Sequence, residues 1–208
     1  MVIKNCQFIL ALCIIAIVSV SSQCNKPRLD CANSKYSFEF GIKAYSDKDS
    51  VNVNDTLWLE INEPTTLTDG FTGQVINYSG AANLGSAISF AKLIAPSLTD
   101  DLVASNFKYL LIKGNEISRP DTAKYREFRF VEVNNYYKFK LGIIPKEQGI
   151  FKMFVSNAAN GYRYNDKCSK ANFIINFKET NQHFYLNEVS FPGITLSGKN
   201  GFYLFKVK

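Results

Sequence analysis

The chain contains a single histidine, His183, so a serine or cysteine nucleophile with a histidine base would depend on it. Its setting, NQHFYL, has no nucleophile elbow beside it. One histidine and a few separated cysteines also lack the ligand spacing of a zinc site. We therefore interpret His183 as a solvated or hydrogen-bonded side chain, and we expect neither a metal nor a cofactor.

Acidic residues offer a second chemistry, because a pair of carboxylates can hydrolyse glycosides. The candidates are Glu39, Glu60, Glu63, Glu127 and Glu132. Most of them occupy the polar positions of alternating segments, where a solvated sheet face accounts for them. Asp47-x-Asp49 and Asp100-Asp101 have calcium-binding residue types but are also ordinary turn sequences. We expect a noncatalytic protein, with a carboxylate-based hydrolase as the last alternative.

Residues 1–22 have the features of an export signal: Lys4, an apolar run from Phe8 to Val20 and the small-residue sequence VSSQ. Its removal lowers the formal net charge from +6 to +5. The remaining basic residues are scattered, which favours a solvated surface and gives no support to nucleic-acid binding. We expect a secreted or cell-envelope attached protein, with a retained membrane anchor as the alternative.

Three cysteines remain after residues 1–22, namely Cys24, Cys31 and Cys168. Three cysteines in an exported protein indicate one disulfide and one further cysteine that is not part of it. Cys24 lies where a bacterial lipoprotein carries its acylated cysteine, although Gln23 before it is not the usual small residue. Lipidation of Cys24 would be the only attachment to a membrane and would leave Cys31 and Cys168 as the sole pair.

Short alternating apolar segments predict that β-strands carry most of the chain, which has 17 Phe and 11 Tyr. In YSFEFGIKAY, Phe38, Phe40 and Ile42 share one face. FKYLLIKG, GIFKMFVS, NFIINFK and GFYLFKV have the same character. We interpret LGSAISFAKLIA and SLTDDLVASNF as segments that could each hold a short helix.

The segment REFRFVEVNNYYKFKLGI predicts a hairpin, because Asn134-Asn135 suits a type I′ turn. Pairing across this turn sets Phe130 opposite Phe139 and Phe128 opposite Leu141, all on one apolar face. Val131 pairs with Lys138, and Arg129 with Lys140, on the other face. A slip of one residue would move the apolar set to the solvent side.

VNVNDTLWLEI resembles the A′–B segment of immunoglobulin-like domains, and FKLGIIPKEQGIF resembles their E–F corner. The resemblance implies an all-β, immunoglobulin-like antiparallel β-sandwich over 34–178. Residues 1–22 are then a signal peptide, 23–33 a linker and 179–208 a C-terminal β extension packed on the same domain. The strands implied are A 36–45, B 56–62, C near 107–113, D 126–133, E 136–143, F 149–156 and G 170–178. A long B–C insertion and Ile61 and Met153 at the two core-cysteine positions depart from the family.

The same resemblance places Cys31 before strand A and Cys168 before strand G, which favours a Cys31–Cys168 disulfide over Cys24–Cys31. It also gathers the B–C insertion, the D–E turn and the F–G loop at one end of the sandwich. The candidate binding surface there comprises Tyr78, Asn134, Asn135, Tyr136, Tyr162, Arg163 and Tyr164. The F–G loop, SNAANGYRYND, mixes aromatic and amide side chains that suit a glycan or a protein surface.

Trp58, the only tryptophan, is out of phase with the apolar positions of its segment. If Leu57, Leu59 and Ile61 face the interior, Trp58 lies on the outer face beside Glu60. We expect the insertion 62–106 or the tail 179–208 to cover it, with a ligand-stacking platform as the alternative.

Together these observations predict a noncatalytic binding or adhesion module of the cell envelope. The main alternative is a structural component that assembles by strand exchange through GFYLFKVK. The composition is also similar to that of uncharacterised exported proteins of Bacteroidetes-type bacteria.

Overall fold

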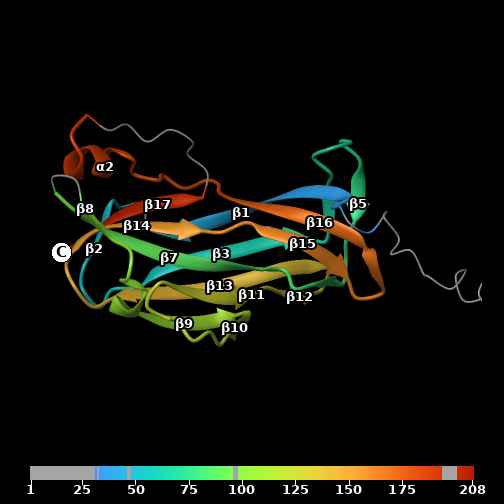
Figure 1. The fold of residues 1–208 in the computed structure, drawn as a ribbon, viewed down its shortest axis with the longest axis horizontal. Coiled ribbons are helices and arrows are strands. Elements are labelled where there is room, and N and C mark those ends of the chain that lie inside the picture. The colour runs from blue at the N-terminus through green and yellow to red at the C-terminus, as the bar shows by residue number, and fades with distance from the viewer. Residues whose placement is uncertain (1–30, 32, 46–47, 96–97, 194–200) are drawn as a thin grey trace, which may run out of the picture. The chain divides into compact units, whose positions relative to one another are not determined.

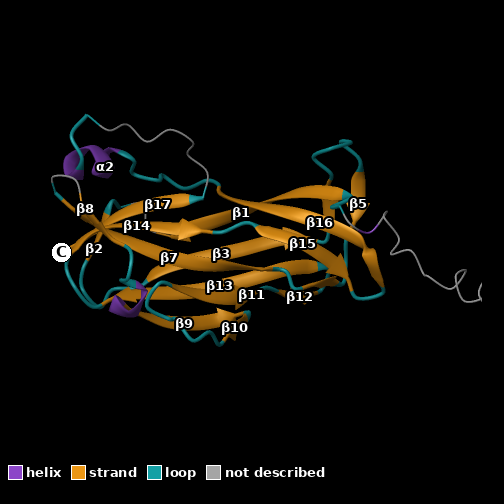
Figure 2. Ribbon diagram, in the orientation of Figure 1, coloured by secondary structure: helices purple, strands orange, loops and turns teal. Residues whose placement is uncertain are grey.

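The computed structural model describes residues 31, 33–45, 48–95, 98–193 and 201–208. The chain divides into two units, residues 1–33 and 34–208. The predicted signal peptide, its cleavage site and Cys24 lie outside the described residues. Strands dominate the described part of the second unit, as Figure 2 shows, which confirms the all-β prediction.

The larger sheet, sheet 1, has eight strands in the described chain, in the order β12-β13-β3-β1-β16-β15-β6, with β9 also paired to β13 (Figure 1). Its strands are β1 (Tyr36–Tyr45), β3 (Leu57–Pro64), β6 (Ala81–Ala82), β9 (Phe107–Lys113), β12 (Val131–Val133), β13 (Tyr136–Pro145), β15 (Ala158–Arg163) and β16 (Asp166–Phe177). β1 runs parallel to β16 and antiparallel to β3, and β3 runs antiparallel to β13.

The second sheet, sheet 2, has seven strands in the described chain, in the order β10-β11-β7-β14-β17-β2, with β8 also paired to β7. These are β2 (Ser50–Val51), β7 (Gly85–Ile94), β8 (Leu98–Asp100), β10 (Asn115–Ile117), β11 (Tyr125–Arg129), β14 (Gly149–Val155) and β17 (Phe202–Val207). A separate hairpin joins β4 (Thr66–Thr68) and β5 (Val75–Asn77). The described chain also contains a 3-10 turn at Ala104–Asn106 and the short helix α2 (Tyr185–Ser190).

The inner faces of the two sheets share one apolar core, which is consistent with the predicted β-sandwich. β1 contributes Phe38, Phe40 and Ile42, and β14 contributes Phe151 and Met153, all buried in the same cluster. Their alternation with outward side chains follows the two-residue period of a strand. The β-strand propensity of these aromatic and branched residues supports the same outcome.

The immunoglobulin-like topology is not confirmed, because the strands that the resemblance assigns to F and G lie in different sheets. β14 pairs with β7 and β17 in sheet 2, whereas β16 pairs with β1 and β15 in sheet 1. The long insertion supplies β7 and the tail supplies β17, so β14 has neighbours that an ordinary immunoglobulin-like domain lacks. The segment predicted as the F–G loop contains strand β15.

The predicted hairpin register is confirmed only next to the turn. Val131 pairs with Lys138, and Asn134 and Asn135 both have positive φ, at 53° and 61°. Beyond Val131 the prediction is wrong, because β11 crosses to sheet 2 while β9 pairs with the second half of β13. β11 lies close to β7 at Gly85, where a Cβ atom would overlap the carbonyl oxygen of Phe128, so this contact needs a residue without a side chain.

The four side chains assigned to the hidden face of this hairpin are nevertheless buried. Phe139 packs against Phe128 and Phe130 with ring centroids 5.6 and 5.2 Å apart, and Leu141 is also in the core. These contacts join the two sheets instead of forming one ladder, so the hydrophobic pattern was right where the strand pairing was not.

The segment LGSAISFAKLIA forms strand β7, so its interpretation as a helix was wrong. Ile88 and Phe90 point into the core, while Ala87 and Ser89 point outward. SLTDDLVASNF contains β8 and the 3-10 turn instead of an α-helix. The outward positions of β7 hold small residues such as Ala87 and Ser89. The segment therefore lacks the clear alternation of apolar and polar residues that normally identifies a strand.

The C-terminal segment GFYLFKVK completes sheet 2 within its own chain. β17 lies between β14 and β2, and Tyr203, Leu204 and Phe205 are fully buried. His183 is buried beside it, with Nδ1 3.1 Å from the Leu204 carbonyl oxygen, as expected for a hydrogen-bonded histidine. The Cys31–Cys168 disulfide is also present, as predicted.

Candidate functional site

The sequence-predicted binding residues do gather at one end of the sandwich. Thr65 links two of them, because its N–H donates to the Asn135 carbonyl oxygen at 2.8 Å and its own carbonyl accepts from the Tyr78 N–H at 2.7 Å. A guanidinium N–H of Arg163 donates to the Asn77 carbonyl oxygen at 2.6 Å. Tyr162 accepts a hydrogen bond from Asn83 at 3.3 Å.

One of these residues, Tyr78, is structural. Tyr78 is fully buried among Tyr36, Phe38 and Phe173, and its hydroxyl donates to the Ser169 carbonyl oxygen. Burial raises the pKa of this hydroxyl to about 12. The assignment of Tyr78 to a binding surface is therefore wrong, because its ring fills the core instead of facing solvent.

The rest of that surface is open in part. The Arg163 guanidinium lies 4.7 Å from the centre of the Tyr78 ring, and thus fixes the end of β15. Tyr136 and Tyr164 are exposed. Asn134 and Asn135 form the exposed turn. The prediction that these residues bind a ligand stays a prediction.

A stronger candidate lies on the outer face of sheet 1, where four neighbouring strands align their outward residues in one row. Tyr45 of β1 pairs with Trp58 of β3, Trp58 with Gly142 of β13, and Gly142 with Leu110 of β9. We call Tyr45, Trp58, Gly142 and Leu110 the Trp58 row. Tyr45 is 50% exposed and Leu110 45%, so the row presents apolar surface to solvent.

Gly142 determines how the indole lies. A Cβ atom on this residue would come within 3.1 Å of Cζ3 and 3.2 Å of Cη2 of Trp58, and 2.8 Å from a methyl group of Thr56. The indole therefore occupies the space above a residue that has no side chain, and rests on the backbone of β13. The half-buried Trp58 is neither a core residue nor a free surface side chain.

Charged residues border the row on one side. Glu60 pairs across the strands with Lys43 and Lys140, and the Lys140 ammonium lies 3.6 Å from the Glu60 carboxylate. The Lys140 Nζ is also 5.7 Å from the centre of the Trp58 ring, within cation–π range. Because these side chains alternate with inward apolar residues, the polar border is a direct consequence of the strand period.

Tyr45 lines two polar hollows. One, of about 350 Å³, is lined by Gly41, Lys43, Tyr45, Glu60, Asn62, Glu63, Lys178 and Glu179. The other, of about 530 Å³, is lined by Tyr45, Lys48, Ser50, Val51, Asn52, Asp55, Thr56 and Lys208. The two hollows place hydrogen-bonding groups beside the Tyr45 ring at the end of the Trp58 row.

Hydrogen bonds raise the pKa values of Tyr45 and Lys43, two of the side chains that line the hollows. A hydrogen bond to Glu60, followed by partial burial, raises the pKa of the Tyr45 hydroxyl. A hydrogen bond to Glu179 and its charge raise the pKa of Lys43. Both side chains therefore keep their protons at neutral pH and act as hydrogen-bond donors.

The five candidate carboxylates are each engaged in an ion pair or a hydrogen bond. Glu60 pairs with Lys140, Glu63 accepts from the Gly41 N–H at 2.8 Å, and Glu132 accepts from the Gly80 N–H at 2.7 Å. Glu39 accepts a hydrogen bond from Asn176, and Glu127 accepts one from Arg119. Such engaged carboxylates are typical of a structured surface.

Metal binding finds no support in the described residues, which contain no group of three His, Cys, Asp or Glu able to hold an ion. Asp100 accepts a hydrogen bond from the Leu102 N–H at 3.0 Å, as in an ordinary turn. Asp47 lies outside the described residues. Nor does the described part of the chain contain a helix with the length and apolarity needed to span a membrane.

The sequence reasoning found Trp58 but missed Tyr45 and Gly142. Tyr45 was detectable in principle, because it has the same strand phase as Glu39 and Lys43 and so must face outward. Gly142 carried no such signal, since its role depends on which strand lies beside β3. Comparisons with family models, with curated proteins and with solved structures gave no match for this chain.

Proposed function

We propose that the protein is an exported, noncatalytic binding module whose ligand is a glycan held on the Trp58 row. The observation that carries this proposal is the indole of Trp58 resting on Gly142, with the Tyr45 ring on the next strand. Rigid aromatic surface of this kind packs against the apolar C–H face of a sugar ring. Export is supported by the disulfide, since such bonds persist outside the reducing cytoplasm.

The polar border supports a sugar over a purely apolar ligand. Sugar hydroxyls both donate and accept hydrogen bonds, and Glu60, Asn62 and Lys43 together offer both kinds of partner. Sites that combine apolar surface with a few placed polar groups are typical of specific ligand binding. Because Tyr45 lines two separate hollows, the site suits a chain of several sugars better than a single one.

The immunoglobulin-like relationship remains part of this proposal. The parallel pairing of β1 with β16 and the antiparallel pairing of β3 with β13 support it, because A–G and B–E pairs are typical of that class. The different partners of β14 would then result from the inserted β7 and the added β17.

The test uses Trp58 as a built-in reporter, because it is the only tryptophan in the chain. We expect titration with cellohexaose, xylohexaose, mannohexaose or chitohexaose to change its emission and to protect it from acrylamide. Calorimetry on Trp58→Ala should then show an affinity loss of about tenfold or more, because one stacked ring is removed. Tyr45→Ala should show a smaller loss.

The matched control is the double variant Tyr162→Ala, Tyr164→Ala, at the predicted end of the sandwich. Normal glycan affinity in this variant is expected. If the double variant loses binding while Trp58→Ala keeps it, the site lies at the sandwich end and the proposal for the Trp58 row is rejected.

A further inference from the structure

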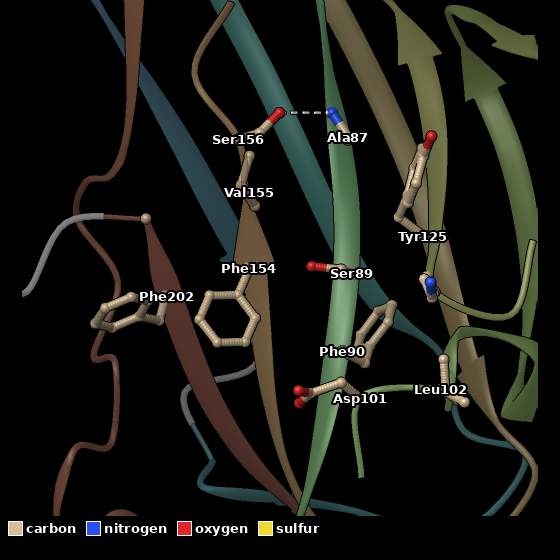
Figure 3. Close-up of a pocket in the computed structure, with 12 residues that line it drawn as sticks. Ala87, Ser89, Phe90, Asp101, Leu102, Tyr125, Phe154, Val155, Ser156 and Phe202 are labelled. Atoms are coloured by element: carbon tan, nitrogen blue, oxygen red, sulfur yellow. Dashed lines mark hydrogen bonds between the residues drawn. The ribbon is translucent and has the colours of Figure 1, made fainter. Parts of the chain in front are cut away.

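Sheet 2 has its own hollow on its outer face, separate from the Trp58 row (Figure 3). Its volume is about 720 Å³, within the range of about 300–1,000 Å³ that is usual for small-ligand sites. Strands β7, β11, β14 and β17 form its floor, with Asp101 and Leu102 at one margin and Gly201 at another. All of its lining residues belong to the described chain.

A second row of outward residues crosses this floor. Phe202 pairs with Phe154, Phe154 with Ser89, and Ser89 with Tyr125. We call Phe202, Phe154, Ser89 and Tyr125 the Phe154 row. The rings of Phe154 and Phe202 are 5.4 Å apart in an edge-to-face arrangement, and Figure 3 shows both side by side across the strands from Ser89. Ser89 leaves a gap between these rings and Tyr125.

The rest of this sheet face is already covered. Helix α2 places Leu186 over Leu93 and Leu204, and Phe191 joins the same buried cluster. The helix therefore closes one part of the outer face, while the Phe154 row remains open beside it. The half-buried rings of the Phe154 row are therefore the part of this apolar face that a ligand can still reach.

Lys152 lies beside this hollow, although it is not one of the residues that line it. Its Nζ lies 5.0 Å from the centre of the Phe154 ring and 5.8 Å from that of Phe202. Among the described residues it forms no ion pair, and burial lowers its pKa, against an opposing effect of the Asp101 charge. The Asp101 carboxylate also lines the hollow, but no salt bridge joins it to Lys152, and a partly desolvated cation without a salt bridge favours an anionic ligand group.

We propose that the hollow binds a small amphipathic anion, namely an acyl or aryl chain that ends in a carboxylate or a sulfonate. The chain lies along the Phe154 row, and the anionic group approaches the Lys152 ammonium. Lys124, which lines the hollow, is ion-paired with Asp121 at 3.5 Å, so we assign the ligand's anionic group to Lys152, where it competes with the Asp101 carboxylate of the lining. This inference goes beyond the proposed glycan site and does not depend on it.

Calorimetry with decanoate and with decyltrimethylammonium tests the charge and the chain together, because the two probes share a ten-carbon chain and differ in sign. We expect the purified protein to bind decanoate about tenfold or more tightly than the cation. Lys152→Met should abolish that preference. Phe154→Ser should weaken both probes by about tenfold or more, because it removes an apolar ring from the floor.

A second variant guards against loss of folding in Phe154→Ser. Ser89→Leu fills the gap in the row without removing a packed ring, and it should also weaken decanoate binding. Tyr164→Ala, an exposed aromatic substitution far along the chain, is the matched control and should bind decanoate normally. Thermal unfolding of each variant checks that the fold is kept.

Three results would overturn the proposal: no decanoate binding up to about 1 mM, the weak limit for a specific site; equal affinity for the two probes; or normal binding by a folded Phe154→Ser variant. Glycan titrations on the same protein report the Trp58 row separately through its emission. A failure of the anion site and a failure of the glycan site are therefore distinguishable.

Discussion

The outer faces of the two sheets carry the same arrangement of side chains in different surroundings. Each has a row across four strands, with three large side chains and one small residue that leaves room among them. The members are Tyr45, Trp58, Gly142 and Leu110 in sheet 1, and Phe202, Phe154, Ser89 and Tyr125 in sheet 2.

The difference lies in the neighbouring positions. In sheet 1 the next position along the strands holds charged residues, Lys43, Glu60 and Lys140. In sheet 2, Lys152 of β14 instead lies between Leu204 and the buried Ala91, beside a cluster covered by α2. The polar border supports the proposed glycan site, whereas the apolar border with one lysine supports the proposed anion site.

The largest expected effect is on the free energy of unfolding, and it compares the loss of an inward ring with the loss of an outward ring on strand β14. Phe151 is fully buried and packs on Phe107 and Phe205, so Phe151→Ala should lower the free energy of unfolding by about 3–5 kcal/mol. Phe154, three residues further on, faces outward, and Phe154→Ala should lower it by only about 1 kcal/mol. Chemical denaturation measures both.

Equal losses in these two variants would contradict the view that the Phe154 row is a ligand surface, because they would make Phe154 part of the structural core. A small loss for Phe154→Ala together with weaker decanoate binding would support the distinction between stability and function on this strand.

A smaller effect on stability is expected for Gly142 and Ser89, the small residues of the two rows. Gly142→Leu would crowd Thr56 and the Trp58 ring, and overpacking of this kind should lower the free energy of unfolding by about 1–3 kcal/mol. Ser89→Leu faces an open hollow and should change it by no more than about 0.5 kcal/mol.

Tryptophan emission gives the second measurement for this pair. Gly142→Leu should shift the emission maximum, because the indole can no longer rest on β13, whereas Ser89→Leu should leave it unchanged. An unchanged emission maximum in Gly142→Leu would mean that Gly142 does not position the indole.

The sequence predicted individual strands better than their partners. Alternation identified β1, β3, β9, β13 and β14 because their inward residues are large. The alternation determines the face on which a side chain lies, but it carries no information on which strand lies alongside. The partners of β14 depend on β7 and β17, which are distant in sequence, and so the F–G pairing was wrong.

The candidate sites follow the same division. Trp58 was found because a single large apolar residue stood in a polar phase. The Phe154 row gave no such signal, because Ser89 lies on a strand whose outward residues are small, and this strand was interpreted as a helix. The aromatic Tyr78 misled for the opposite reason, since a tyrosine within a long insertion is equally compatible with a surface and with a core.

The smallest expected effect concerns Lys152, where binding and stability should oppose each other. Its lowered pKa means that the folded protein releases this proton more readily than the unfolded chain, so the charged form costs stability at neutral pH. Lys152→Met keeps the apolar stem and removes the charge. It should raise the free energy of unfolding at pH 7 by at most about 0.5 kcal/mol, because the group is only partly buried and solvent screens its charge.

The pH dependence of this gain identifies its source. As the pH rises through the lowered pKa of the folded state towards the ordinary value of 10.5, the wild-type lysine loses its charge and its cost, so the advantage of Lys152→Met should shrink. Urea denaturation at pH 7 and pH 10 measures the change. A variant that is less stable at pH 7 would show that the attraction of the ammonium to Phe154 and Phe202 outweighs its desolvation, and the lysine would then be explained by stability without a ligand.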